Sequence, residues 1–132
     1  MEMLTKQPTT KGPDTMFTGG VWFDVIVRGE PPSRVRTNTV RFSPGARTAW
    51  HSHAVGQTLY VTEGIGLVQA RGGNLVEMHP GDVIWTPPDE WHWHGAAAAN
   101  FMTHIAIWEA PESGDESTWG DLVTDAEYPR AR

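Results

Sequence analysis

The 132-residue chain contains no cysteine. It can therefore form neither disulfide bonds nor thiolate metal sites, so a bound metal would need nitrogen or oxygen ligands. No stretch approaches the roughly 18 consecutive apolar residues that a membrane span requires. The N-terminal residues also lack the apolar run of a signal peptide. These absences favour a cytoplasmic protein with no membrane partner.

Basic residues are also scarce. The only lysines are Lys6 and Lys11, the arginines are scattered, and the formal net charge is −6. A nucleic-acid surface needs clustered Lys and Arg that neutralise phosphates. We therefore expect no nucleic-acid partner.

Turn-forming and aromatic residues are abundant, with 14 glycines, 10 prolines and 7 tryptophans. Short runs rich in β-branched and aromatic residues alternate with turn signals, and no window has the period of an amphipathic helix. This pattern predicts one all-β domain over residues 1–132, a sandwich or barrel, with a loose arm at 1–15 and a barrel core at 35–109. The predicted strands are 21–27, 35–42, 48–53, 58–62, 65–70, 75–78, 83–86 and 101–109, with a final strand or docking segment at 119–124.

Five of the six histidines form a pattern typical of a metal site. His51 and His53 are two residues apart on a predicted strand, so both imidazoles leave the same face. His92 and His94 repeat this spacing, and His104 lies in the middle of a later strand. Imidazole is the commonest nitrogen ligand of metals. The pattern indicates a divalent metal site, with an edge or dimer contact as the alternative for each pair.

Two segments resemble the sequence motifs of the cupin superfamily. From Gly45 to Gly64 the chain has a glycine, five residues, His-Ser-His, three residues, Gln57, six residues and a glycine. From Gly81 to His92 it has a glycine, five residues, and Pro-Pro-Asp-Glu-Trp-His. The resemblance implies a jelly-roll β-barrel with a metal inside. Its ligands would be His51, His53, Gln57 and His92.

The chain departs from these motifs at two positions. Asp89 replaces a glycine, at a turn position that Asp tolerates. Gln57 replaces the usual glutamate, so an amide takes the place of a carboxylate and leaves both charges of a divalent cation uncompensated. Such a cation is a stronger Lewis acid. The alternative is that Gln57 is no longer a ligand and that the metal binds weakly.

A narrower resemblance covers nearly the whole chain. Pro-Gly-Ala-Arg-Thr-Ala-Trp-His-x-His, His-Trp-His-Gly-Ala-Ala and Met-Thr-His-x-Ala-Ile are similar to segments of the small bacterial manganese-dependent cupin hydroxynitrile lyases. This resemblance implies Mn²⁺, although imidazole and amide ligands also suit Fe²⁺, Zn²⁺, Ni²⁺ and Co²⁺. It implies a small-molecule substrate, a cyanohydrin or an aldehyde plus cyanide. The metal would act as a Lewis acid on the hydroxyl oxygen, and His94 and His104 would supply the base and the acid, with either residue in either role.

The pocket wall should come from inward positions of neighbouring strands. The predicted wall is mostly apolar and consists of Asn38, Val40, Phe42, Thr48, Leu59, Met102 and Trp108. By the same parity, Trp50, Trp85, Trp91 and Trp93 should point away from the metal and pack on the outer face.

The strand at 101–109 is apolar on both faces. One face can fill the barrel, and the other must be covered by the terminal segments or by a second subunit. We expect a homo-oligomer, a dimer or a tetramer. Two other functions stay open: an oxygen-dependent cupin enzyme with iron, and a non-catalytic cupin that binds a small ligand. The histidines beyond the ligand set favour the lyase over the binding protein, and Gln57 favours it over the oxygen-dependent enzyme.

Overall fold

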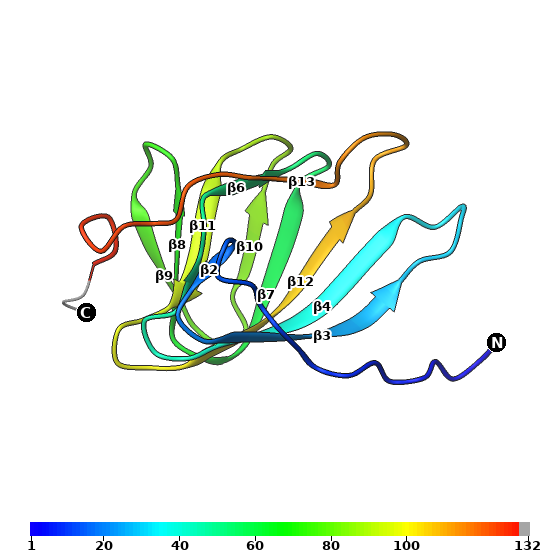
Figure 1. Ribbon diagram of the computed structural model, residues 1–132, viewed down its shortest axis with the longest axis horizontal. Coiled ribbons are helices and arrows are strands. Elements are labelled where there is room, and N and C mark those ends of the chain that lie inside the picture. Colours follow the sequence, from blue (N-terminus) through cyan, green and yellow to red (C-terminus); the bar gives the residue numbers. More distant parts are fainter. Residues whose placement is uncertain (130–132) are drawn as a thin grey trace.

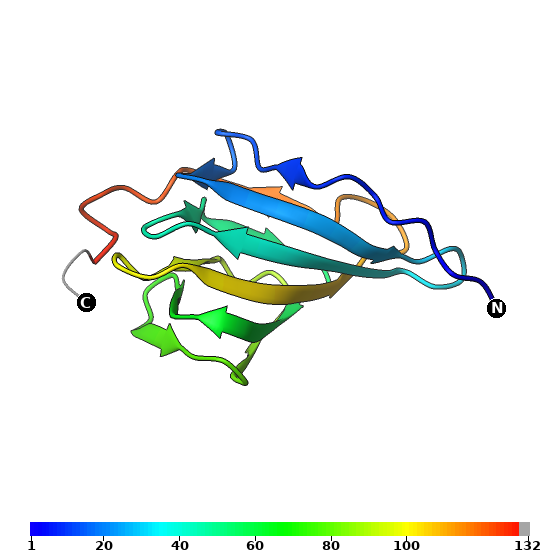
Figure 2. The ribbon, with the colours of Figure 1, turned by 90° about the horizontal axis from the view of Figure 1, so that it is seen from below.

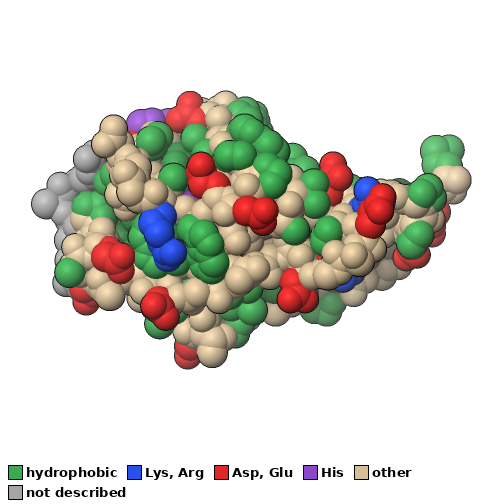
Figure 3. Space-filling view, turned by 90° about the horizontal axis from the view of Figure 1, so that it is seen from above, with side chains coloured by type: hydrophobic (Ala, Val, Ile, Leu, Met, Phe, Trp, Pro, Cys, Tyr) green, Lys and Arg blue, Asp and Glu red, His purple; other side chains and the backbone are tan. Residues whose placement is uncertain are grey.

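The computed structural model describes residues 1–129. Every regular element among them is a β-strand, so the prediction of a single all-β domain is confirmed (Figure 1). Within this range no helix is long and apolar enough to cross a membrane. Acidic side chains are spread over the face shown in Figure 3, with hydrophobic side chains between them, as the negative net charge leads one to expect.

The first sheet has six antiparallel strands, and its middle strands lie side by side in Figure 2. In spatial order the strands are β1 (Thr10–Lys11), β3 (Val21–Arg28), β4 (Val35–Phe42), β12 (Met102–Glu109), β7 (Gln57–Gly64) and β10 (Val83–Thr86). The central strand β12 pairs along its whole length with β4 and along most of it with β7. This sheet carries all the predicted pocket residues except Thr48, which lies in the second sheet.

The second sheet is also antiparallel and curls over the first. Its strands are β2 (Phe17–Thr18), β5 (Arg47–Thr48), β6 (His51–His53), β8 (Gly66–Ala70), β9 (Leu75–Met78), β11 (His92–Ala96) and β13 (Ser117–Trp119). One edge of β11 pairs with β5 and β6, and the other pairs with β8. The β8–β9 hairpin joins the strands that were predicted at 65–70 and 75–78.

The predicted strand at 48–53 is broken into β5 and β6. At the break, the N–H of Ala49 donates to the carbonyl of Met16, and the N–H of Trp50 donates to the carbonyl of Asp121. Two chain segments therefore cover one strand edge: β2 pairs with β5, and β13 pairs with β6. In Figure 1 the chain from β13 onward runs beside β6. The last strand is thus 117–119, and the residues after it dock by turns.

Two hydrophobic clusters stabilise this arrangement. The larger lies between the sheets and includes Val21, Val40, Phe42, Leu59, Val61, Met78 and Met102. The smaller lies under the C-terminal segment and consists of Trp50, Leu67, Trp93, Val123 and Tyr128, with Trp91 packed against it. Trp50, Trp91 and Trp93 therefore pack on the outer face as predicted, whereas Trp85 is exposed.

A buried arginine fixes the C-terminal segment to β5. The Arg47 guanidinium donates to the carbonyl of Val123 at 2.8 Å and to Asp125 at 3.0 Å, and it lies over the ring of Tyr128. The Tyr128 hydroxyl donates to the carbonyl of Ala96 at 2.7 Å. These bonds tie the end of the described chain to the strands that carry the histidines.

The glycine that closes the first motif gives a test of the fold. Gly64 and Gly45 have nearly equal positive φ, 81° and 79°. A Cβ at Gly64 would overlap the carbonyl oxygen of Phe101, whereas a Cβ at Gly45 would meet open space. We expect Gly45→Ala to cost about 1–2 kcal/mol, the ordinary cost of a left-handed non-glycine residue. Gly64→Ala should cost more than about 3 kcal/mol because of the added clash. Urea denaturation of both variants measures the difference, and equal losses would contradict this account.

Candidate metal centre

Three buried histidines from two paired strands converge on one point. His51 and His53 lie on β6 and His92 on β11, with His51 and His92 directly opposite each other in the ladder. One ring nitrogen of each lies within 4.8 Å of those of the other two. The equal parity of His51 and His53, predicted from the sequence, accounts for their common direction.

The hydrogen bonds of these rings leave one nitrogen of each free to bind a metal. The Nδ1 atoms of His51 and His92 lie 2.8 and 2.9 Å from the carbonyl oxygens of Ala49 and Glu90. Because a carbonyl can only accept, both Nδ1 atoms must carry the hydrogen, and their Nε2 atoms then have a free lone pair. His53 Nε2 is buried and has no hydrogen-bond partner among the described residues. The donor set therefore fits a divalent cation that prefers nitrogen ligands.

Gln57 supplies an oxygen at the same point. It begins β7 in the first sheet, it is buried, and its Oε1 lies 3.4 Å from His92 Nε2. The structure thus brings together all four predicted ligands, three imidazoles and one neutral amide.

Burial keeps these imidazoles neutral. It is the main cause that lowers the pKa of His53 to about 4, with the neighbouring His92 as a second cause. Burial also lowers the pKa of His92, and it holds the pKa of His51 well below its usual range. Near pH 7 the free nitrogens therefore carry lone pairs, which is the state that a metal requires.

Two further histidines, His94 and His104, form a hydrogen-bonded pair beside the three-histidine cluster. His94 Nδ1 and His104 Nε2 are 3.0 Å apart and share one hydrogen. Burial lowers the pKa of His104 to about 4 and holds that of His94 well below its usual range, so both rings are neutral. The other nitrogens, His94 Nε2 and His104 Nδ1, are buried without a partner among residues 1–129. A neutral ring has one N–H, so whichever ring donates the shared hydrogen, the pair presents one bare nitrogen and one N–H.

A cavity of about 580 Å³ opens over both clusters. The predicted wall residues Asn38, Val40, Thr48 and Trp108 line it, together with His51, His53, Gln57, His94 and His104. Three other predicted wall residues, Phe42, Leu59 and Met102, lie instead in the core between the sheets. Parity gave their inward direction correctly, but their positions are too deep to reach the cavity. Phe42 packs against the rings of His94 and His104 from the core side.

A further part of the cavity wall was not predicted from the sequence. Phe23 on β3 and Ala106 on β12 belong to it, and the terminal segments contribute the other residues, which are Pro13, Met16, Phe17, Asp115, Glu116, Ser117 and Trp119. Trp119 stacks on His51 with centroids 4.5 Å apart and planes 17° from parallel. Glu116 accepts a hydrogen bond from the Trp108 indole at 2.9 Å and pairs with Arg36. Apart from aromatic character at Phe17, Phe23 and Trp119, nothing in the sequence marked these positions.

Comparisons with known proteins agree with this geometry. The cupin domain family matches residues 38–107. The chain is 49% identical over 130 residues to an (R)-mandelonitrile lyase from Granulicella tundricola, covering 98% of both proteins.

Solved structures of other proteins share the fold of this chain. A cupin-like protein from Thermotoga maritima superposes with a TM-score of 0.86 at 38% identity, covering 97% of this chain and 95% of that one. A polyketide cyclase from Streptomyces resistomycificus, at 18% identity, shares the fold alone, with a TM-score of 0.71 over 97% of this chain and 90% of its own. The chain therefore belongs to the cupin family, as a homologue of the (R)-mandelonitrile lyase.

Proposed function

We propose that this protein is a metal-dependent hydroxynitrile lyase that cleaves or forms cyanohydrins. The observation that carries the proposal is the hydrogen-bonded pair His94–His104 beside the three-histidine cluster, with residues of both lining one cavity. The full-length similarity to a mandelonitrile lyase supports the same chemistry.

We propose that His51, His53, His92 and Gln57 hold Mn²⁺. The chain has no thiolate that would favour a softer metal, and an amide oxygen suits a hard cation. The resemblance to manganese-dependent lyases supports Mn²⁺ over Fe²⁺, Zn²⁺, Ni²⁺ and Co²⁺, which the same ligands accept. When bound, the cation supplies Lewis acidity that lowers the pKa of a nearby hydroxyl group.

The histidine pair can carry out both proton transfers of the reaction. Its bare nitrogen takes the hydroxyl proton of the cyanohydrin, and the bond between the carbinol carbon and the nitrile carbon then breaks, with its electron pair leaving on cyanide. The N–H at the other end of the pair protonates cyanide, so the products are an aldehyde and hydrogen cyanide. If the shared hydrogen moves across the 3.0 Å bond during this exchange, both rings end neutral. A pair of buried rings, in which a lasting positive charge is costly, is suited to this relay.

The aromatic wall fits an aryl substrate. Phe17, Phe23, Trp108 and Trp119 all line the cavity, and Val40 and Met16 lie among them. These side chains would hold the apolar part of the substrate and exclude water from the histidines. The proposed substrates are therefore cyanohydrins of aromatic or aliphatic aldehydes.

Metal removal tests the whole proposal. We expect the Mn²⁺-loaded protein to release cyanide and benzaldehyde from mandelonitrile, and the chelator-treated protein to lose this activity, because the hydroxyl proton would no longer be acidified. Adding Mn²⁺ back should restore it. The measurement is benzaldehyde absorbance together with the bound metal content.

The metal-loaded protein also separates the alternatives. No cyanide release from mandelonitrile and from aliphatic cyanohydrins would overturn the lyase proposal. Oxygen uptake by the iron-loaded protein with catechols or flavonols would instead indicate an oxygen-dependent enzyme. Binding of small ligands without turnover would indicate a binding protein.

His104→Gln tests the proton relay. Glutamine can still hydrogen-bond to His94 but cannot accept a proton, so we expect kcat to fall by about 10²- to 10⁴-fold. The bound metal content should stay unchanged, because His104 is outside the ligand cluster. His79→Gln is the matched control, since His79 is exposed on a turn and should retain full turnover. Full turnover by the His104 variant would remove His104 from the mechanism.

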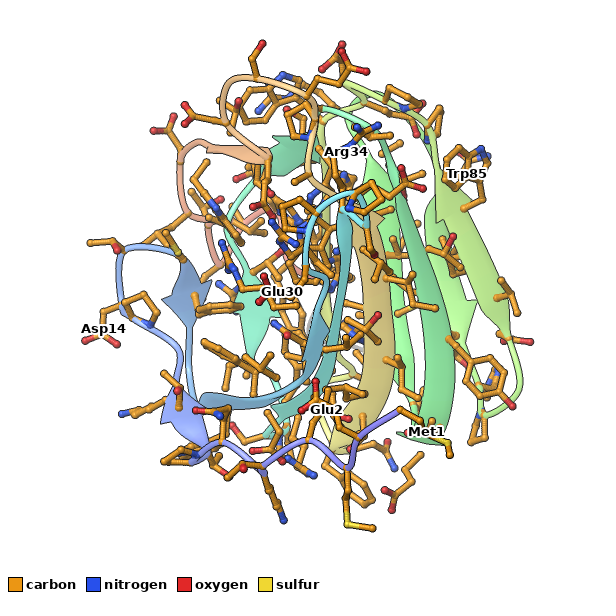
Figure 4. All side chains as sticks on the ribbon, turned by 90° about the vertical axis from the view of Figure 1, so that its right-hand side faces the viewer. Met1, Glu2, Asp14, Glu30, Arg34 and Trp85 are labelled. Carbon is orange, nitrogen blue, oxygen red and sulfur yellow. The ribbon has the colours of Figure 1, made fainter. Side chains whose placement is uncertain are left out.

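We also propose that the protein is a homo-oligomer, a dimer or a tetramer, formed through the outer face of the first sheet. Tyr60, Val83, Trp85 and Ile107 are exposed there, and Val83 lies opposite Tyr60 in the β10–β7 ladder. Trp85 projects on the outside of the molecule (Figure 4). The sequence analysis offered two covers for this face, the terminal segments or a second subunit. Because no terminal segment among the described residues covers Ile107, we propose a second copy of the chain as the cover.

Light scattering after size exclusion tests this assembly. The wild type should have a mass that is a multiple of 14.6 kDa, and Trp85→Glu should shift it towards the single-chain mass. Leu122→Glu, at an exposed apolar residue of the C-terminal segment, should leave the mass unchanged. A monomeric wild type at micromolar concentration would contradict the proposal.

A further inference from the structure

The three histidines of the metal cluster are oriented by different kinds of partner. His51 and His92 hydrogen-bond through Nδ1 to backbone carbonyls two residues earlier on their own segments. Of these three Nδ1 atoms, only that of His53 bonds to a side chain: it lies 2.9 Å from the hydroxyl oxygen of Ser117, 64 residues away in the sequence. Backbone carbonyls persist whatever the side chains are, whereas the partner of His53 depends on one residue.

We propose that Ser117 is a positioning residue that fixes the ring of His53 and thereby sets the affinity of the metal centre. The inference rests on the metal centre of the proposed function. A metal ligand must present Nε2 without a hydrogen, and this is ensured when Nδ1 carries the hydrogen and donates it to an acceptor. The hydroxyl oxygen of Ser117, 2.9 Å from Nδ1, has the lone pairs to be that acceptor, and we assign it this role. Partners of this kind fix both the tautomer and the ring orientation of metal-bound histidines.

The position of Ser117 does not depend on its own hydroxyl. Its strand, β13, is paired with β6 so that Ser117 lies opposite His53. The N–H of Ala54 donates to the carbonyl of Glu116, and the N–H of Gly120 donates to the carbonyl of Trp50. Both sides of Ser117 are thus held by backbone bonds. A change of its side chain should remove the acceptor and leave the strand in place.

The next residue on the strand is a matched control. Thr118 lies opposite Ser52 and is exposed, so its hydroxyl faces away from the histidines. It has the same hydroxyl chemistry on the same short strand. Thr118→Ala therefore reproduces the loss of a hydroxyl from β13 without touching His53.

Binding of Mn²⁺ alone, measured by competition with a chelator, tests the inference. We expect Ser117→Ala to weaken Mn²⁺ binding by about 10- to 100-fold, the usual effect of removing a partner of a ligand histidine. Ser117→Thr keeps a hydroxyl at this position and should restore the affinity. Thr118→Ala should bind Mn²⁺ as the wild type does.

The tautomer of His53 gives a second readout that a general structural role would not change. Long-range ¹H–¹⁵N correlation spectra of the metal-free protein should show His53 protonated at Nδ1 in the wild type and in Ser117→Thr. In Ser117→Ala the spectra should show a mixture of the two tautomers, while His51 and His92 keep theirs.

Two results would overturn the inference. One is wild-type Mn²⁺ affinity in Ser117→Ala. The other is an equal loss in Ser117→Ala and Thr118→Ala, which would assign the effect to the strand and not to the hydroxyl. Because metal binding is measured without any substrate, these outcomes are independent of cyanide release. The lyase proposal can fail while Ser117 keeps this role, and the reverse also holds.

Discussion

Five imidazole rings lie against one another inside the barrel, and each has to stay neutral while one of its nitrogens finds a hydrogen-bond partner. The ring centroids of His51 and His92 are 4.3 Å apart, and those of His94 and His104 are 4.8 Å apart. At such distances a charge on one ring disfavours a charge on the next, in addition to the cost of burial. The partners then divide the rings into two groups. Three bond outward and leave a nitrogen for a metal, and two bond to each other and make up the proposed proton relay.

The outward bonds of the metal cluster explain why the chain termini matter for the site. β5 and β6 pair with the same edge of β11 and are separated by a break at Ala49 and Trp50, so two separate segments pair with their other edge. The N-terminal segment covers β5 and brings Phe17 to the cavity. The C-terminal segment covers β6 and brings Ser117 and Trp119 to the histidines. The pocket is therefore completed by residues outside both motifs.

The sequence predicted the features of the site that depend on local spacing and missed those that depend on distant segments. Strand parity is a local property, so the common direction of His51 and His53, and of His92 and His94, followed from their spacing. Depth is not local: Val40, Phe42, Leu59 and Met102 all belong to the core between the sheets, but only Val40 also lines the cavity. The contact between Ser117 and His53 joins residues 64 positions apart, and no local pattern encodes such a pairing. The break at Ala49 was missed for the same reason, since its cause is two distant carbonyl groups.

The neutral side chain of Gln57 affects both the protonation of the neighbouring histidines and the charge of a bound metal. Its amide oxygen lies 3.4 Å from His92 Nε2, among rings whose neutrality the site depends on. A carboxylate at this point would attract a proton to the neighbouring imidazoles and raise their pKa, so that a proton would compete with a metal for the same nitrogens. The neutral amide avoids this competition. It also leaves both charges of a divalent cation uncompensated by the four proposed ligands, so the charge acts fully on a hydroxyl group in the cavity. The replacement of a carboxylate by an amide thus has two effects. In the metal-free protein it favours neutral imidazole rings, and in the metal-bound protein it favours stronger Lewis acidity.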